Sequence, residues 1–184
     1  MILHINCCTR KESRTKRLAN ALLEKLNGEV EEVNLYQQNL SPMTEDKLFR
    51  RSELSQKKAF SDDIFKFARQ FAQADTIVVS VPFWDLSFPA VLKLYVENIY
   101  VTGLVTEYDK NGNPHGLCKA KKLYYVATAG GAFNPKYSFE YLKDLAQNYF
   151  GIKDVELIAA EKLDIEGMDS EKILEATIAE IKAN

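Results

Sequence analysis

The first residues able to do chemistry stand in residues 7–15, which read CCTRKESRT and lead directly into a leucine-rich segment with helical spacing. Hydroxyls from Thr9, Ser13 and Thr15, the guanidinium of Arg14 and the free amides at a helix start together form a phosphate-binding set. A second interpretation stays open, in which Ser13 only caps the helix and the basic residues form a solvated face. We therefore expect either a phosphate site or a capped helix with a basic surface.

The same loop also fits a different enzyme chemistry. Cys8, Arg14 and Thr15 have the Cys-x5-Arg-Thr spacing of the low-molecular-weight tyrosine phosphatases, in which a thiolate attacks phosphorus and the arginine binds its oxygens. Those phosphatases use an Asp-Pro general acid, and this chain contains no Asp-Pro pair. A phosphatase-like enzyme remains the alternative interpretation, without its proton donor.

A second candidate segment, residues 82–89, reads PFWDLSFP and follows the apolar run of residues 76–81. Its aromatic and apolar side chains stand where a strand of the expected sheet ends. A flat, partly apolar ligand such as an isoalloxazine stacks well on such a wall. The alternative is a hydrophobic staple that locks the loop onto the following helix.

A third candidate segment is Thr128, Ala129, Gly130 and Gly131, which follows the β-rich run of residues 122–128. Because glycine has no side chain, the backbone here can approach a ligand closely. The glycine pair alone is weak evidence for a ligand site. It is strengthened because this segment falls on the same edge of the expected sheet as the two other loops.

The elements that must position these three loops alternate along the chain. Runs rich in β-branched and apolar residues predict five strands, at residues 2–6, 30–35, 76–81, 122–128 and 155–160. Amphipathic spacing predicts helices at residues 13–26, 62–73, 88–101, 138–150 and 170–182, with a charged surface helix from residue 45 onward. This alternation predicts an α/β fold with a parallel sheet between helix layers. Such a sheet binds its ligand beyond the carboxyl ends of its strands, where the three loops lie.

Composition narrows the function classes. The chain has 184 residues, 46% of them hydrophobic and 27% charged, which predicts a single globular domain over residues 1–184. A net charge of -2 gives no reason to expect nucleic acid as a partner, and no apolar run reaches membrane-spanning length. Three cysteines without a paired framework favour a reducing, cytoplasmic location. Two distant histidines give no metal site.

A family resemblance joins these observations. Residues 82–84, 88–93 and 128–131, with Gly103 and the pair Lys121-Lys122, resemble the flavodoxin-like NAD(P)H quinone reductases and FMN-dependent azoreductases over most of the chain. The resemblance implies a flavodoxin-like three-layer sandwich with a five-stranded sheet of order 2-1-3-4-5. It also implies a homodimer.

The resemblance further implies a cofactor and its binding residues. FMN would place its phosphate on Cys8, Thr9, Ser13, Arg14 and Thr15, and its ring against Pro82, Phe83, Trp84, Asp85 and Leu86 and against Thr128, Ala129, Gly130 and Gly131. NADH or NADPH would give a hydride to flavin N5, from which it passes to a quinone-like or azo-like acceptor. Because the cofactor does this chemistry, we assign no side chain a catalytic role.

Three positions qualify the resemblance. Many azoreductases of the family have asparagine where this chain has Asp85, and a carboxylate near the ring disfavours an anionic reduced flavin. The family often has serine at the position of Cys8. Tyr108 begins a turn-rich excursion, residues 108–114, where the family has a flap over the flavin, so it either contacts substrate or packs a surface loop.

Two other classes share this topology. An electron-transfer flavodoxin would bind FMN without using NAD(P)H, although flavodoxins are usually strongly acidic and this chain is close to neutral. A receiver domain needs acidic residues after the first strand to bind magnesium, and Asn6-Cys7-Cys8 supplies none.

Overall fold

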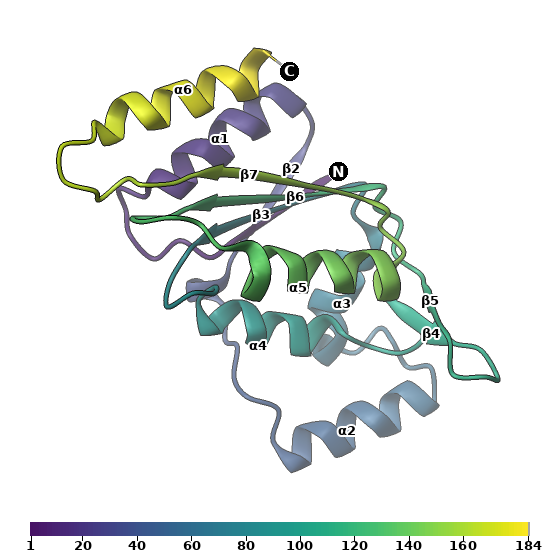
Figure 1. The fold of residues 1–184 in the computed structure, drawn as a ribbon. Helices are drawn as coiled ribbons and strands as arrows, with labels where there is room; N and C mark the ends of the chain where they lie inside the picture. Colours follow the sequence, from purple (N-terminus) through teal and green to yellow (C-terminus); the bar gives the residue numbers. More distant parts are fainter. Residues whose placement is uncertain (184) are drawn as a thin grey trace.

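The computed structural model describes residues 1–183, which form a twisted parallel sheet with helices on both faces (Figure 1). Its strands are β1 (Ile2–Asn6), β2 (Val30–Asn34), β3 (Thr76–Pro82), β6 (Lys122–Thr128) and β7 (Asp154–Ala160). All four neighbouring pairs are parallel, in the order β2-β1-β3-β6-β7. This confirms the predicted order 2-1-3-4-5, with β2 at one edge as its imperfect alternation indicated.

Helices cover the sheet in two layers (Figure 1). One layer consists of α1 (Arg14–Leu26) and α6 (Ser170–Ala183), and the other of α3 (Lys66–Gln73), α4 (Ala90–Ile99) and α5 (Phe139–Asp144). Two separate clusters of buried side chains fill the two interfaces between sheet and helices. Because β3 is covered on both faces, its residues are buried continuously from Ile77 to Val81, and all of them except Ser80 are apolar.

The helix bounds follow local chemistry. Ser13 caps α1 by accepting a hydrogen bond from the Lys16 amide, and Asn27 ends it in the left-handed conformation, with φ of 47°. The helix predicted from residue 88 begins only at Ala90, because Pro89 is extended. The segment predicted over 62–73 starts with a 3-10 turn, η2 (Asp63–Phe65). The one predicted over 138–150 continues from α5 as a π-helical turn, η4 (Leu145–Phe150).

The remaining elements lie outside the main layers. They are the short turns η1 (Leu35–Gln37) and η3 (Pro135–Tyr137), the helix α2 (Glu45–Gln56) and a hairpin of β4 (Thr106–Tyr108) and β5 (Pro114–Gly116). Helix α2 buries no residue, as expected of a surface helix. The hairpin was not expected from the sequence, which predicted only turns there. Within residues 1–183, no helix is both long enough and apolar enough to cross a membrane.

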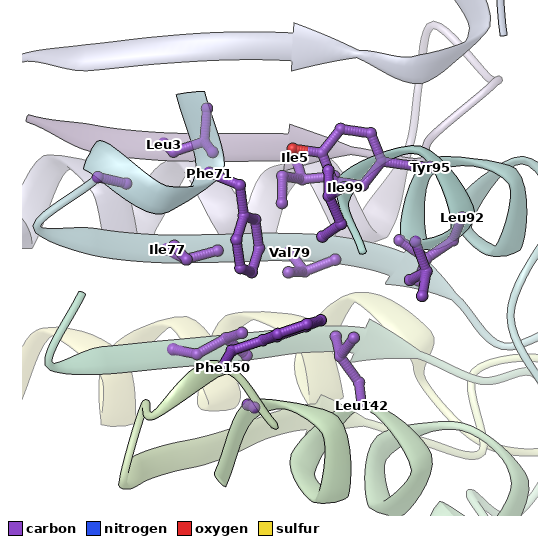
Figure 2. Close-up of a cluster of buried hydrophobic side chains, with 14 of the residues drawn as sticks. Leu3, Ile5, Phe71, Ile77, Val79, Leu92, Tyr95, Ile99, Leu142 and Phe150 are labelled. Atoms are coloured by element: carbon purple, nitrogen blue, oxygen red, sulfur yellow. The ribbon is translucent and has the colours of Figure 1, made fainter. Parts of the chain in front are cut away.

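The larger core cluster fixes the lower helix layer against the sheet (Figure 2). Phe71 of α3 and Phe150 of η4 meet edge to face, with ring centroids 5.3 Å apart. Tyr95 of α4 is fully buried in the same cluster, and Phe67 packs edge-on against it at 5.6 Å. Such interlocked aromatic contacts hold the strands and helices rigidly, so the loops at the strand ends start from fixed points.

Candidate functional site

A pocket of about 340 Å³ opens at the carboxyl ends of β1, β3 and β6. That volume lies within the range of small-molecule sites. Its lining consists of Cys8, Thr9, Arg10, Glu12, Ser13, Arg14, Thr15, Pro82, Phe83, Trp84, Thr128, Ala129, Gly130, Leu163 and Asp164. The three loops singled out from the sequence therefore meet around one pocket.

The start of α1 forms the polar side of this pocket. Ser13 Oγ accepts the Lys16 amide at 3.2 Å, while the amides of Arg14 and Thr15 belong to the first turn and have no intrahelical acceptor. The first turn of α1 carries no acidic residue. Free amides, hydroxyls and a guanidinium at a positive helix end match the needs of a phosphate. The donor set thus fits the phosphate of FMN.

Hydrogen bonds join this polar side to the third loop. Thr15 Oγ1 and Thr128 Oγ1 are 2.5 Å apart, across the gap between α1 and the end of β6. The amide of Phe83 donates to the carbonyl of Thr128 at 2.9 Å, which adds the second loop. The relative positions of the three loops are therefore set by direct contacts.

Arg14 is held at the pocket mouth by the loop after β7. Its Nη1 donates to the Leu163 carbonyl at 3.2 Å and to Asp164 Oδ1 at 2.8 Å. A Cβ on Gly130 would lie 2.4 Å from Asp164 Oδ2, whereas a Cβ on Gly131 would meet nothing within 4 Å. Gly130 therefore makes room for the carboxylate that holds Arg14, where the sequence suggested room for the ligand itself.

The sequence analysis missed this fourth loop. Leu163 and Asp164 donate their amides to the carbonyls of Ala129 and Gly130, at 3.2 and 2.9 Å. Arg10 and Glu12 also line the pocket and were not assigned to it. One signal was available, because β7 is the neighbour of β6 and its carboxyl end must reach the same edge of the sheet.

The aromatic side of the pocket is a tight two-residue turn. Trp84 and Ser87 exchange both backbone hydrogen bonds, at 3.0 and 2.8 Å, and the two residues between them have positive φ, 49° for Asp85 and 65° for Leu86. These angles define a type I′ turn. The ring of Phe83 packs against that of Phe133 at 4.9 Å.

Four residues discussed from the sequence do not line the pocket: Asp85, Leu86, Gly131 and Tyr108. Leu86 projects from the turn and is 61% exposed. The Tyr108 hydroxyl lies 2.8 Å from that of Tyr100, in the hairpin at the far end of the sheet (Figure 1). Within this chain Tyr108 therefore packs a surface loop.

Cys8 lies in the wrong environment for a nucleophile. It is 6% exposed, and burial is the main cause that raises the pKa of its thiol. Its Sγ lies 3.8 Å from Ser80 Oγ. Phosphate-ester attack needs the thiolate, which this environment disfavours. The phosphatase interpretation thus lacks both its proton donor and its activated sulfur.

Proteins with similar sequences are consistent with an FMN site in this pocket. The family model described as flavodoxin-like fold matches residues 1–184. The chain is 36% identical to FMN-dependent NADH:quinone oxidoreductase 2 of Clostridium acetobutylicum, over 98% of the chain and 96% of that protein. It is 33% identical to an FMN-dependent NADH:quinone oxidoreductase of Clostridium perfringens, over 97% of the chain and 93% of that protein.

Solved structures share the fold. An azoreductase from Bacillus anthracis has a TM-score of 0.84 at 24% identity, with 99% of this chain and 96% of that chain covered. An FMN-dependent NADH-azoreductase from the same species, in complex with FMN, has a TM-score of 0.80 at 22% identity, with 99% and 95% covered. The chain therefore belongs to the flavodoxin-like fold family, within the group of FMN-dependent NADH:quinone oxidoreductases.

Proposed function

We propose that this protein is an FMN-dependent oxidoreductase that passes a hydride from NADH to a quinone-like or azo-like acceptor. One observation carries the proposal: a single pocket joins a phosphate-binding helix start to an aromatic wall. FMN supplies the hydride-transfer chemistry when it is bound. The names of the two Clostridium relatives support FMN as the cofactor and NADH as the donor.

The residues of the chain would divide the work of holding FMN. Ser13, Arg14 and Thr15, with Thr9 beside them, would bind the phosphate through amides, hydroxyls and the guanidinium. The positions of Ser13, Arg14 and Thr15 at the start of α1 support this role. Cys8, whose amide donates to Asn6, would line this part of the pocket without a bond to the phosphate.

The ring would lie between the second and third loops. Pro82, Phe83 and Trp84 present apolar surface, and Thr128 to Gly130 present backbone on the other side. Asp85 and Leu86 do not line the pocket themselves, but they follow Trp84, which does, in the type I′ turn at its rim. A carboxylate at this rim disfavours an anionic reduced flavin, so we propose that Asp85 shifts the range of acceptors relative to relatives with asparagine. No side chain is given an acid or base role.

The test begins with the visible spectrum of the purified protein before and after addition of FMN. NADH oxidation is then followed with a quinone and with an azo dye, and p-nitrophenyl phosphate hydrolysis is measured in parallel. A flavin spectrum with acceptor-dependent NADH oxidation is the expected result. A flavin spectrum without NADH oxidation would instead identify an electron-transfer flavodoxin. A colourless protein that ignores FMN and cleaves the ester would identify the phosphatase-like alternative.

We also propose a homodimer. Helix α2 supports it, because this helix buries no residue and exposes Leu48 at 48% and Phe49 at 72%. Large exposed apolar side chains on one helix are typical of an interface. Light scattering should give twice the chain mass for the natural protein, with a shift toward one chain mass in Phe49→Asp. Gln56→Glu, at an exposed position of the same helix, adds the same single negative charge and is the control.

Two broader properties complete the proposal. We propose that the chain functions as a single domain, because both helix layers pack on one sheet. We propose a cytoplasmic location, supported by three free cysteines, of which Cys7 and Cys8 are buried. Fractionation of the producing cell would test the location.

A further inference from the structure

Three polar side chains are buried beneath the loop of residues 7–13, which leads into the proposed phosphate site. They lie on the sheet face that α1 covers. His4 and Asn6 of β1 are each 1% exposed, and Ser80 of β3 is 0% exposed. Ile2 and Val78, which are also buried on this face, are apolar and belong to the smaller core cluster. Burying a polar group is costly unless it is hydrogen-bonded, so a buried polar set within an apolar face calls for an explanation.

The three side chains form a chain of hydrogen bonds that ends on the loop. His4 Nε2 and Ser80 Oγ are 2.9 Å apart, and Ser80 Oγ donates to Asn6 Oδ1 at 3.4 Å. Asn6 Oδ1 also accepts the backbone amide of Cys8 at 2.8 Å.

The other end of the Asn6 amide reaches β2 and α1. Asn6 Nδ2 donates to Glu32 Oε1 at 2.7 Å, and Lys16 Nζ donates to the same oxygen at 3.3 Å. The amide orientation is fixed, since the reverse orientation would turn Nδ2 toward the Cys8 amide and Oδ1 toward a carboxylate. Asn6 thus connects the loop, β2 and the first turn of α1 through one side chain.

We propose that Asn6 is a positioning residue for the FMN phosphate, and that its bonds to Cys8 and Glu32 set the loop conformation before the cofactor binds. The bond to Asn6 turns the Cys8 amide inward, so the loop presents Thr9 and the residues that follow it to the pocket. The Lys16 to Glu32 contact anchors the start of α1 to the same point. Preorganised donors cost less ordering on binding, which raises affinity. This inference rests on the proposed FMN function.

The test exchanges the donor and acceptor of one hydrogen bond. Asn6→Asp places two carboxylates where the structure has a 2.7 Å amide-to-carboxylate bond, while it keeps an acceptor for the Cys8 amide. We expect FMN to bind about tenfold or more weakly to this variant, the effect of losing a charge-assisted hydrogen bond. In Asn6→Asp with Glu32→Gln, the amide and the carboxylate have changed places and the bond can form again. We expect this double variant to recover most of the loss.

A second readout needs no FMN. Hydrogen exchange of the apoprotein, read by mass spectrometry over residues 7–17, should speed up in Asn6→Asp and slow again in the double variant. Thr106→Val is the matched control, because Thr106 is a buried polar residue in the hairpin and does not line the pocket. It should lower the melting temperature of the apoprotein without changing FMN affinity or exchange over residues 7–17.

Several results would overturn the inference. Asn6→Asp that binds FMN as tightly as the natural protein would remove the positioning role. Equal losses in the single and double variants would show that the hydrogen bond itself does not matter. A natural protein that ignores FMN would sink the proposed function, whereas the exchange arm would still decide whether Asn6 orders the loop.

Discussion

Arg14 offers the sharpest test of the phosphate site, because its surroundings allow its contribution to be worked out. Its Nη1 lies 2.8 Å from Asp164 Oδ1 at the pocket mouth. Arg14→Ala removes the guanidinium and leaves the Asp164 carboxylate without its partner at a site proposed for an anion. Both changes weaken phosphate binding. The attraction between Arg14 and the phosphate is lost, and the repulsion between Asp164 and the phosphate is no longer offset by Arg14.

The expected loss of FMN affinity can be estimated from the solvent exposure of the Arg14 side chain. Two unit charges 4 Å apart interact by about 1 kcal/mol in water and about 4 kcal/mol at an effective dielectric constant near 20. The Arg14 side chain is 38% exposed, between those limits. We therefore expect a loss of about 2 kcal/mol, which is about 30-fold in the FMN dissociation constant. Asp164 is 67% exposed, so removing its repulsion in Arg14→Ala with Asp164→Asn should restore about threefold.

Quenching of FMN fluorescence by apoprotein measures these constants directly. Arg17→Ala is the control, because Arg17 is on the same helix but pairs with Glu171 and Glu175, away from the pocket. It should leave FMN affinity unchanged. High salt should reduce the gap between natural protein and Arg14→Ala. The reasoning fails if Arg14→Ala and Arg17→Ala bind FMN equally, or if the double variant binds no more tightly than Arg14→Ala.

Four further outcomes are expected. The buried Tyr95 hydroxyl has no hydrogen-bond partner among the described residues. Tyr95→Phe should therefore raise the free energy of unfolding by about 1 kcal/mol in urea titrations, and a lower value would contradict this prediction. Burial lowers the pKa of His4 from 6.5 to about 4, so the folded protein binds a proton there less readily than the unfolded chain does. The free energy of unfolding should therefore fall by about 3 kcal/mol as the pH is lowered from 6.5 to 4. In urea titrations across that range, His4→Gln should not show this fall. Cys8→Ser should bind FMN as the natural protein does in the fluorescence titration, and p-nitrophenyl phosphate should not be hydrolysed by either. Leu86→Gly should raise the free energy of unfolding in urea by about 1 kcal/mol, because glycine adopts the left-handed conformation freely; unchanged stability would contradict strain at this turn.

Much of the fold could be predicted because its signals are local. Residues 76–81 read TIVVSV, in which four of the six residues are apolar, and a strand covered on both faces produces such a run. Alternating strands and helices then require crossovers, which make the sheet parallel and send the carboxyl ends to one edge. With the strand order that the family resemblance implied, this predicted that the loops at Cys8, Pro82 and Thr128 meet.

The features that could not be predicted from the sequence depend on contacts between segments far apart in the chain. Asp164 stands in an unremarkable polar stretch, and its role depends on the space left by Gly130 and on a guanidinium 150 residues away in sequence. The β4 and β5 hairpin depends on Gly116, where a Cβ would lie 2.0 Å from the Gly151 nitrogen. Neither close approach leaves a periodic pattern in the sequence. Strands of three residues are also too short to show alternation.

The two sides of the pocket are held by different physical means, and this has a consequence for function. The phosphate side rests on buried hydrogen bonds through Asn6, which favour one rigid arrangement. The aromatic side rests on a turn with two non-glycine residues at positive φ, which stores about 1 to 3 kcal/mol of strain for each. Changes beneath the loop should therefore act on FMN affinity. Changes at Asp85 and Leu86, at the exposed rim, should act on which acceptor is reduced while the cofactor stays bound.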